Sequence, residues 1–286
     1  DGGLVIAQER GLQRFSFDGT DIRGEIAQLD SAFREVIKRH NYPPLIAREI
    51  GELMAATALL SANLKFKGRL TLQLRLSGNV TLLQAETNEQ GQLRAIARYD
   101  ENSRADELSF EQGQMVITIE PEQGQKYQGI TAISGGNIAQ ALQDYFEQSE
   151  QLGSRFWLFS DGTRAAGLML QKLPAMTSDD PDAWDRIGHL ASTVKEEEIL
   201  QLNADDVLHR LFHEEQTRIY PASALSFFCT CSKDRIASAL HQLGHAELND
   251  MIAEQGKIEI TCEFCAQHYA FDQRQVDELF PEQRPH

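Results

Sequence analysis

Cysteine is missing from the first 228 residues of the chain, and all four cysteines lie in its last fifth. A long cysteine-free stretch followed by paired thiols suits the reducing cytosol better than a secreted disulfide scaffold. The most apolar run, residues 53–60, has eight residues, whereas a membrane-spanning helix needs roughly 20. The first residues show no basic segment followed by an apolar core. We therefore expect a cytoplasmic protein with no signal peptide and no membrane partner.

Basic residues are scarce, with 27 Lys and Arg against 43 Asp and Glu, so the formal net charge is −16. A surface this negative repels phosphate backbones, which argues against a nucleic-acid partner. Hydrophobic residues make up 41% of the chain, enough to bury a proper core and too many for a disordered protein. At 286 residues, one core domain plus a smaller appendage is the natural expectation.

Recognisable catalytic motifs are also absent. The pair Gly135-Gly136 lacks the spacing of a dinucleotide loop or a P-loop. The run from His213 to Thr217 begins like a zinc-protease helix, but Thr217 stands where the second histidine is required. There is no nucleophile elbow and no pair of acids in a recognisable frame. We therefore predict that the protein is not an enzyme and has no catalytic residues.

Residues 1–176 mix strand and helix patterns. Leu70, Leu72 and Leu74 alternate with polar residues, as in a strand with one buried face. Apolar residues recur at helical spacing over 29–37 and 50–58, and Asn137 is a suitable cap for a helix that reaches Phe146. We predict an α+β core domain over residues 1–176 with much antiparallel sheet. Further strands are predicted at residues 93–99, 115–120, 127–133, 155–159 and 166–173.

Residues 177–228 differ in charge, with 11 acidic and 4 basic residues. Residues 178–181 favour a helix start before an apolar stripe that ends at Val194, and Asn203 favours a second start before Val207 and Leu211. Short helices this acidic are marginal alone and depend on docking against a neighbour. We predict a helical acidic linker over 177–228. On composition alone, a solvated connector is the simplest interpretation.

Residues 229–286 are too few to build a strong core, so we expect a bound metal to stabilise this part of the chain. Ser232 can cap a helix that ends near Leu243, and a second helix is predicted over 246–254. Residues 257–261 and 268–271 alternate like two strands. We therefore predict a small C-terminal zinc-binding domain over residues 229–286.

The cysteines form two close pairs, Cys229-Thr230-Cys231 and Cys262-Glu263-Phe264-Cys265, separated by thirty residues. Two thiol pairs joined by a helix-sized spacer are the layout of a four-cysteine zinc site. We predict that the reduced chain binds one Zn²⁺ through Cys229, Cys231, Cys262 and Cys265.

The first pair has unusual spacing, because one residue separates its cysteines where zinc fingers and ribbons have two to four. Fully extended, three residues place their outer Cα atoms roughly 7 Å apart, so a small kink would let Cys229 and Cys231 join in a disulfide. The four sulfurs can therefore hold a metal or form two local disulfides, which indicates a redox switch. The alternatives are a permanently structural zinc site, four incidental thiols, and replacement of one ligand by His268.

These residues resemble a known family, the redox-regulated heat-shock chaperones of bacteria called 33 kDa chaperonins. The specific motif is the two cysteine pairs followed by His268-Tyr269-Ala270-Phe271. The similarity spans nearly the whole chain from about Gly11. Its other matching segments are residues 127–129, 144–146, 149–152, 165–171 and 206–215.

The resemblance implies an ATP-independent holdase whose reduced, zinc-bound form is inactive. It implies that peroxide with heat, or hypochlorous acid, converts the thiols to two disulfides, here Cys229–Cys231 and Cys262–Cys265. Zinc then leaves and the linker unfolds. The chaperone binds unfolding client proteins, commonly as a homodimer, and the clients pass later to ATP-dependent foldases.

Two rival functions come from other classes. The first is a constitutive zinc-ribbon interaction module whose cysteines do not switch between thiols and disulfides. The second is a thiol–disulfide oxidoreductase that uses Cys262 and Cys265. An oxidoreductase of this kind would need a thioredoxin-like strand–motif–helix context, whereas here the motif is predicted at a strand end.

Overall fold

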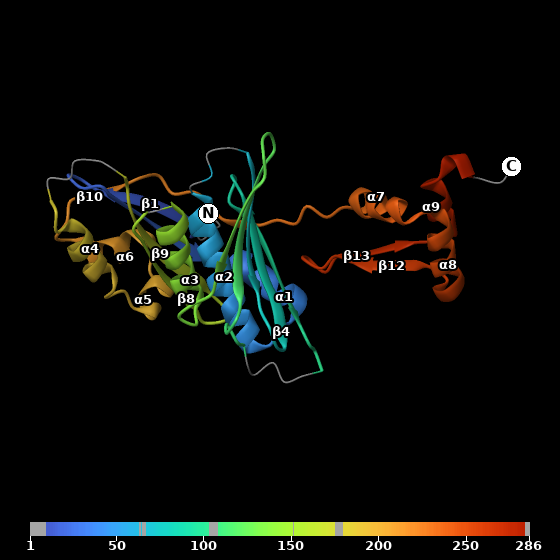
Figure 1. Ribbon diagram of the computed structural model, residues 1–286, viewed down its shortest axis with the longest axis horizontal. Coiled ribbons are helices and arrows are strands. Elements are labelled where there is room, and N and C mark those ends of the chain that lie inside the picture. Colours follow the sequence, from blue (N-terminus) through green and yellow to red (C-terminus); the bar gives the residue numbers. More distant parts are fainter. Residues whose placement is uncertain are drawn as a thin grey trace, which may run out of the picture. The chain divides into compact units, whose positions relative to one another are not determined.

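The computed structural model describes residues 10–62, 64, 67–102, 108–150, 152–174 and 180–283. The chain divides into two compact units, Asp1–Phe228 and Cys229–His286 (Figure 1). Helices and strands are interspersed in both units, so the predicted α+β class is confirmed. None of the described helices is long and apolar enough to cross a membrane.

Two sheets build the first unit. The five-stranded sheet has the order β10-β1-β2-β9-β8, and the six-stranded sheet has the order β11-β5-β4-β3-β6-β7. Neighbouring strands pair antiparallel except β11, which pairs parallel to β5. The strands of the first sheet are β1 Leu12–Phe17, β2 Ile22–Leu29, β8 Ser154–Ser160, β9 Ala165–Lys172 and β10 Thr217–Ile219. Those of the second are β3 Gly68–Arg75, β4 Val80–Asn88, β5 Gln92–Tyr99, β6 Gln114–Pro121, β7 Tyr127–Ala132 and β11 Ser226–Phe227.

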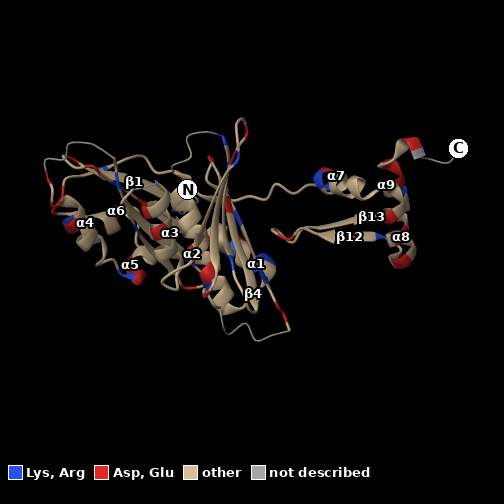
Figure 2. Cartoon of the chain, in the orientation of Figure 1, with Lys and Arg blue, Asp and Glu red and all other residues tan. Residues whose placement is uncertain are grey.

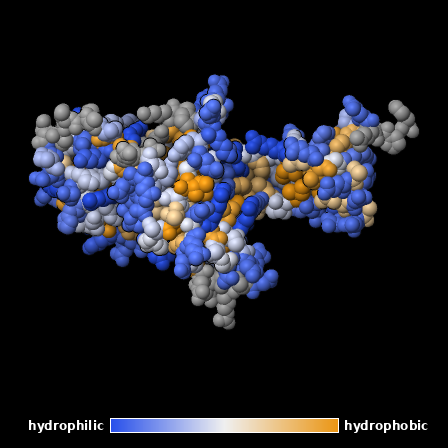
Figure 3. Space-filling view, in the orientation of Figure 1, coloured by the Kyte–Doolittle hydropathy of each residue, from blue (hydrophilic) through white to orange (hydrophobic). Residues whose placement is uncertain are grey.

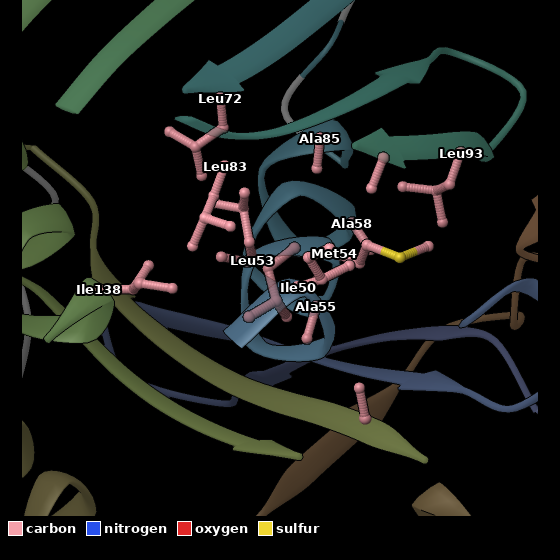
Figure 4. Close-up of a cluster of buried hydrophobic side chains, with 14 of the residues drawn as sticks. Ile50, Leu53, Met54, Ala55, Ala58, Leu72, Leu83, Ala85, Leu93 and Ile138 are labelled. Carbon is pink, nitrogen blue, oxygen red and sulfur yellow. The ribbon is translucent and has the colours of Figure 1, made fainter. Parts of the chain in front are cut away.

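Helix α2 (Pro44–Ser61) is the centre of the main core. Pro44 occupies the first turn, where a missing N–H costs nothing, and every residue from Leu53 to Ser61 is buried. Figure 4 shows its apolar side chains facing Leu72 and Leu83 of the six-stranded sheet on one side, with the strands of the five-stranded sheet on the other. Helices α1 (Ser31–His40) and α3 (Ile138–Tyr145) complete this core, and the π-helical turn η1 (Phe146–Glu150) follows α3.

The other face of the five-stranded sheet is covered by three helices of the acidic stretch: α4 (Ala183–Ala191), α5 (Glu196–Gln201) and α6 (Ala204–Phe212). Helix α6 begins after Asn203 as predicted. Helix α4 begins at Ala183, later than the start predicted at residues 178–181, and it ends before Val194. Residues 178 and 179 lie outside the described residues.

Two features of this stretch were not predicted. Glu196, Glu197 and Glu198 form the first turn of α5, where the positive end of the helix dipole favours acidic side chains. Strands β10 and β11 also lie within residues 177–228 and join one sheet each. The stretch predicted as a helical linker therefore contains three helices and, in its final part, two short strands that pair with β1 and β5.

The second unit contains α7 (Lys233–Leu243), α8 (His245–Gln255), the hairpin β12 (Ile258–Thr261) and β13 (His268–Phe271), α9 (Gln273–Glu278) and the short 3-10 turn η2 (Pro281–Gln283). All of these except α9 and η2 were predicted. Among the described residues of this unit, a small set of apolar side chains forms the buried cluster, and a core this small provides little stability by itself. They are Leu240, Leu248, Ile252, Ile258, Phe271, Val276 and Phe280.

One further sequence expectation was wrong. Its helical spacing predicts that Leu29 lies on the face of a helix, but Leu29 ends strand β2, and α1 begins at Ser31. The sequence Ile22–Leu29 contains no clean polar–apolar alternation because β2 is buried on both faces. A strand of this kind has no period-two signal to detect.

Glu25 on β2 is an ionisable side chain inside the main unit, with 1% of its surface exposed. Neither carboxylate oxygen has a hydrogen-bond partner among the described residues, and the nearest cation, Nε of Arg14, is 3.9 Å away. Burial raises the pKa of this carboxyl to about 8, although Arg14 and Arg23 act against the shift. A buried carboxyl with so little compensation favours its protonated form in the fold.

We predict that stability falls from pH 5 to pH 8 as Glu25 ionises. Because its pKa is higher in the fold than in the unfolded chain, the folded state binds the proton more tightly in this window, on the order of 3 kcal/mol for a shift of this size. Glu25→Gln keeps a neutral side chain, so its melting temperature should exceed that of the wild type at pH 8 and approach it at pH 5. Equal differences at both pH values would contradict this account.

Candidate metal and redox centre

The hairpin loop between β12 and β13 holds the second cysteine pair. The backbone N–H of Cys262 donates to the carbonyl of Gln267 at 2.9 Å, and the N–H of Ala266 donates to the carbonyl of Cys262 at 2.8 Å. Ala266 has a φ of 61°, which is the left-handed conformation that such a tight return requires. These bonds fold the loop so that Cys262 and Cys265 can face one site.

The first cysteine pair lies in the segment directly before α7. Ser232 is the N-cap of α7, and its hydroxyl accepts a hydrogen bond from the N–H of Arg235 at 3.1 Å. Cys231 therefore directly precedes the positive end of the α7 dipole. A helix N-terminus stabilises a nearby thiolate, which is the form that binds metal and reacts with oxidants.

All four cysteine sulfurs lie within 4.8 Å of one another. The Sγ atoms of Cys229 and Cys262 are 3.7 Å apart, and those of Cys231 and Cys265 are 3.2 Å apart. Zinc binds thiolates at about 2.3 Å, so the sulfurs of a tetrahedral site are about 3.8 Å apart. All four cysteines are free thiols, and only Cys265 is fully buried. The donor set and its spacing fit a four-thiolate zinc ion.

Tyr269 adds a polar contact to this cluster. Its hydroxyl lies 3.3 Å from the sulfur of Cys231, and this contact raises the pKa of Tyr269 to about 12. Burial opposes ionisation of Cys231, but hydrogen bonds with Tyr269 and the other thiols outweigh it and lower the pKa of Cys231. Burial raises the pKa of Cys265 to about 12. In the absence of a metal, the Cys231 thiol therefore ionises more readily than the Cys265 thiol.

The structure brings all four predicted cysteines together, whereas His268 lies outside their cluster. The His268 ring is about half exposed and lies beside Thr261 and Glu259, at 3.3 and 3.6 Å. The Cys262–Cys265 motif lies between two strands of a hairpin and does not open a helix, so the thioredoxin-like context is not present here. Tyr269 was part of the sequence motif, but its contact with Cys231 was not foreseen.

A family model described as Hsp33 protein matches residues 11–272. The chain belongs to the Hsp33 family. Proteins named 33 kDa chaperonin are its relatives over nearly their whole length. That of Pseudomonas aeruginosa strain PAO1 is 44% identical, over 94% of this chain and 93% of its own. That of Shewanella sp. strain ANA-3 is 44% identical, over 91% of this chain and 92% of its own.

The fold is likewise that of Hsp33. The crystal structure of the 33 kDa chaperonin from Thermotoga maritima matches with a TM-score of 0.81, and the match covers 96% of this chain and 99% of that one at 21% identity. Hsp33 is a family of heat-shock chaperones, and these are not enzymes. Because chaperones bind unfolded proteins, membership of the family implies that this chain does so as well.

We predict one zinc ion per reduced chain. Replacing any one of the four cysteines by serine should weaken binding sharply, because three thiolates and a water make a poorer structural shell. His268→Ala is the matched control, since His268 belongs to the same hairpin but lies outside the cluster. Metal analysis of the purified variants is the measurement. Loss of zinc from His268→Ala, with zinc retained by a cysteine variant, would overturn the ligand assignment.

Proposed function

We propose that this protein is a redox-regulated, ATP-independent holdase that is inactive when reduced and active when its thiols are oxidised. The observation that carries the proposal is the cluster of four free thiols within 4.8 Å at the end of a chain of the Hsp33 family. Such a cluster can exchange a bound metal for disulfides, whereas a site with histidine ligands could not lose its whole shell in this way.

In the reduced state, Cys229, Cys231, Cys262 and Cys265 would hold one zinc ion. A structural zinc ion contributes about 10 kcal/mol or more to the folding of a small module. Among its described residues, the second unit has a core of seven buried apolar side chains, so it would depend on this contribution. The four cysteine sulfurs that would bind the zinc ion are also the groups that an oxidant attacks.

Oxidation would remove the ligands two at a time. Each disulfide forms as two thiols lose two protons and two electrons, which reduce one peroxide molecule to two waters. We propose the pairs Cys229–Cys231 and Cys262–Cys265. Neighbours in sequence close very short loops, so they can join with little chain rearrangement.

The element that responds would be the stretch of residues 177–228, between the core of residues 1–176 and the cysteine module of residues 229–286. Its helices α4, α5 and α6 cover an apolar face of the five-stranded sheet. Phe212 is the central contact, with its ring 5.8 Å from that of Phe15 and 5.0 Å from that of Phe17. The strand residues under the helices are Phe15, Phe17, Ile22, Ile26, Ala166, Leu168 and Leu170.

Polar contacts hold α5 in place as well. The buried amide of Gln28, on β2, donates to the carbonyls of Ile199 and Leu202 at 2.9 and 2.7 Å. Arg10 donates to the same Leu202 carbonyl at 3.1 Å and pairs with Asp30. These contacts satisfy carbonyls at the end of α5 that have no partner within a helix so short. The docked state is therefore specific in its geometry.

Docking would nevertheless be weak enough to reverse. The stretch carries much of the negative charge of the chain, and Figure 2 marks acidic positions along the segment of α4, α5 and α6. Only Phe228 separates β11 from Cys229, so loss of order in the cysteine module would reach the stretch through the chain itself. Undocked helices and a bare sheet would then offer apolar surface to clients, and the acidic charge would keep the complex soluble.

The remaining partners follow from the same family resemblance. We propose that the oxidised chaperone acts as a homodimer in the cytoplasm during oxidative and heat stress. Bound clients would pass to ATP-dependent foldases for refolding once reducing conditions return.

We predict that oxidation pairs sequence neighbours. Peptide mapping of the peroxide-treated protein should recover Cys229–Cys231 and Cys262–Cys265 as the dominant bridges. In the reduced structure, the shortest sulfur contact joins Cys231 to Cys265, so mapping separates local pairing from pairing across the site. A dominant bridge between the two pairs would refute this step.

We also predict that breaking the docked state mimics oxidation. Leu211 is buried on α6 against the sheet, and Leu211→Asp should cost several kcal/mol, on the order of 3, by placing a charge there. The reduced, zinc-loaded variant should suppress aggregation of a heat-unfolded client. His209→Asp puts the same charge on the exposed side of α6 and should leave the reduced protein inactive. If α4–α6 of Leu211→Asp exchange freely with deuterium but no client is protected, undocking is not the switch.

The rival function is a constitutive zinc-binding interaction module. It shares the ligand set and differs in the response to oxidant. For that module, mild peroxide would change neither the zinc content nor the binding of unfolded proteins.

A further inference from the structure

The four outer edges of the two sheets are not alike. Strands β10 and β11 are edges of only three and two residues, and very short edge strands are one way in which proteins prevent unwanted pairing. Strand β8 is longer, but the backbone N–H of Phe156 on it donates to the side chain of Gln143, on α3, at 3.0 Å. The fourth edge, β7, has six residues and is paired in the described structure with β6 alone.

The hydrogen-bond pattern shows which β7 groups face outward. The N–H of Ile133, just beyond β7, donates to the carbonyl of Gly113 at 2.9 Å. Bonded and non-bonded pairs alternate along an antiparallel ladder, and Gly129 and Thr131 are in register with Ile117 and Met115. The bonded residues toward β6 are therefore the odd-numbered ones. The N–H and C=O groups of Gln128, Ile130 and Ala132 point away from the sheet.

The side chains of β7 do nothing to protect this edge. Its sequence, YQGITA, contains no charge and no proline, which are the usual protective devices on an edge strand. Ile130 is 55% exposed and Tyr127 is 45% exposed. In Figure 3, hydrophobic surface gathers over the area where the green strands of the six-stranded sheet lie in Figure 1. A regular strand with this composition is a template for another strand.

We propose that the free edge of β7 binds an extended segment of an unfolded client protein by strand addition. This inference rests on the proposed holdase function and assigns part of its client-binding surface. In strand addition the main chain supplies the affinity, so partners need no common sequence. The exposed Ile130 and Tyr127 favour β-branched and aromatic residues across the strand pair, and these are the residues that an unfolding protein exposes.

Charge favours a client over a second copy of this chain as the occupant. Each copy carries a net charge of −16, so pairing along the narrow β7 edge would bring two acidic chains together for the gain of only a few main-chain hydrogen bonds, and we expect the homodimer proposed above to use another surface. The edge itself is uncharged and imposes no charge on a client. Strand β7 contains no cysteine, so we expect its edge to bind extended chain in the reduced and the oxidised protein alike, although in the reduced protein too weakly to protect a client. Oxidation then adds apolar surface to an edge that already binds extended chain weakly.

The test separates the main chain of β7 from its side chains. Ile130→Pro removes an outward N–H, a change tolerated on the solvent side of an edge strand, and Ile130→Ala removes the same side chain but keeps that N–H. The probe is a fluorescein-labelled octapeptide of alternating Thr and Val, measured by anisotropy with the reduced and oxidised protein. We expect Ile130→Pro to bind about fivefold more weakly than Ile130→Ala in both states, the equivalent of about one hydrogen bond.

Gln128→Pro removes another outward N–H and should repeat the loss, which protects the result against a fold defect at one site. Thermal unfolding and zinc content confirm that each variant is folded. Equal binding by Ile130→Pro and Ile130→Ala overturns the proposal. So does a result in which Ile130→Pro converts an oxidised dimer to a monomer without changing peptide affinity, because the edge then serves self-association. If the oxidised wild type protects no client, the holdase function fails, whatever the peptide shows.

Discussion

The five-stranded sheet is hydrophobic on both faces, and this constraint organises the rest of the molecule. One face packs against α2 in the main core, and the other packs against α4, α5 and α6. Central strands buried on both faces need two covers. The first cover is the helix at the centre of the main core, which contacts both sheets. The second is an acidic segment of short helices, and in the function proposed above its loss would expose an apolar surface of the kind that binds unfolded chains.

In the function proposed above, a metal site of four cysteines would give this cover a chemical control. The described residues of the small cysteine module bury few apolar side chains, so its order would depend on a metal held by the four sulfurs, which lose their ligand capacity when oxidised. The Gln28 amide and the Phe212 ring make the docked state specific, while the excess of acid would keep it close to undocking. Stability and sensitivity to oxidants would then lie in different parts of one chain.

Sequence patterns predicted the elements with strong local signals and missed those defined by tertiary context. Leu70, Leu72 and Leu74 alternate, and their strand is present in β3. Strand β2 carries no alternation because both its faces are buried, and β10 and β11 are too short to have a period at all. At the cysteine site, the spacing of the two pairs predicted four sulfurs in one place. The contact of Tyr269 with Cys231 was not predictable, since it depends on how the β12–β13 hairpin turns toward the segment before α7.

The central claim is that the state of the thiols controls the cover of the five-stranded sheet. The most direct measurement follows three signals in one peroxide time course: zinc release, deuterium exchange of residues 183–212, and suppression of client aggregation. The account predicts that all three advance together and that reductant reverses the exchange. Full protection of clients while zinc stays bound and α4–α6 stay protected from exchange would contradict it.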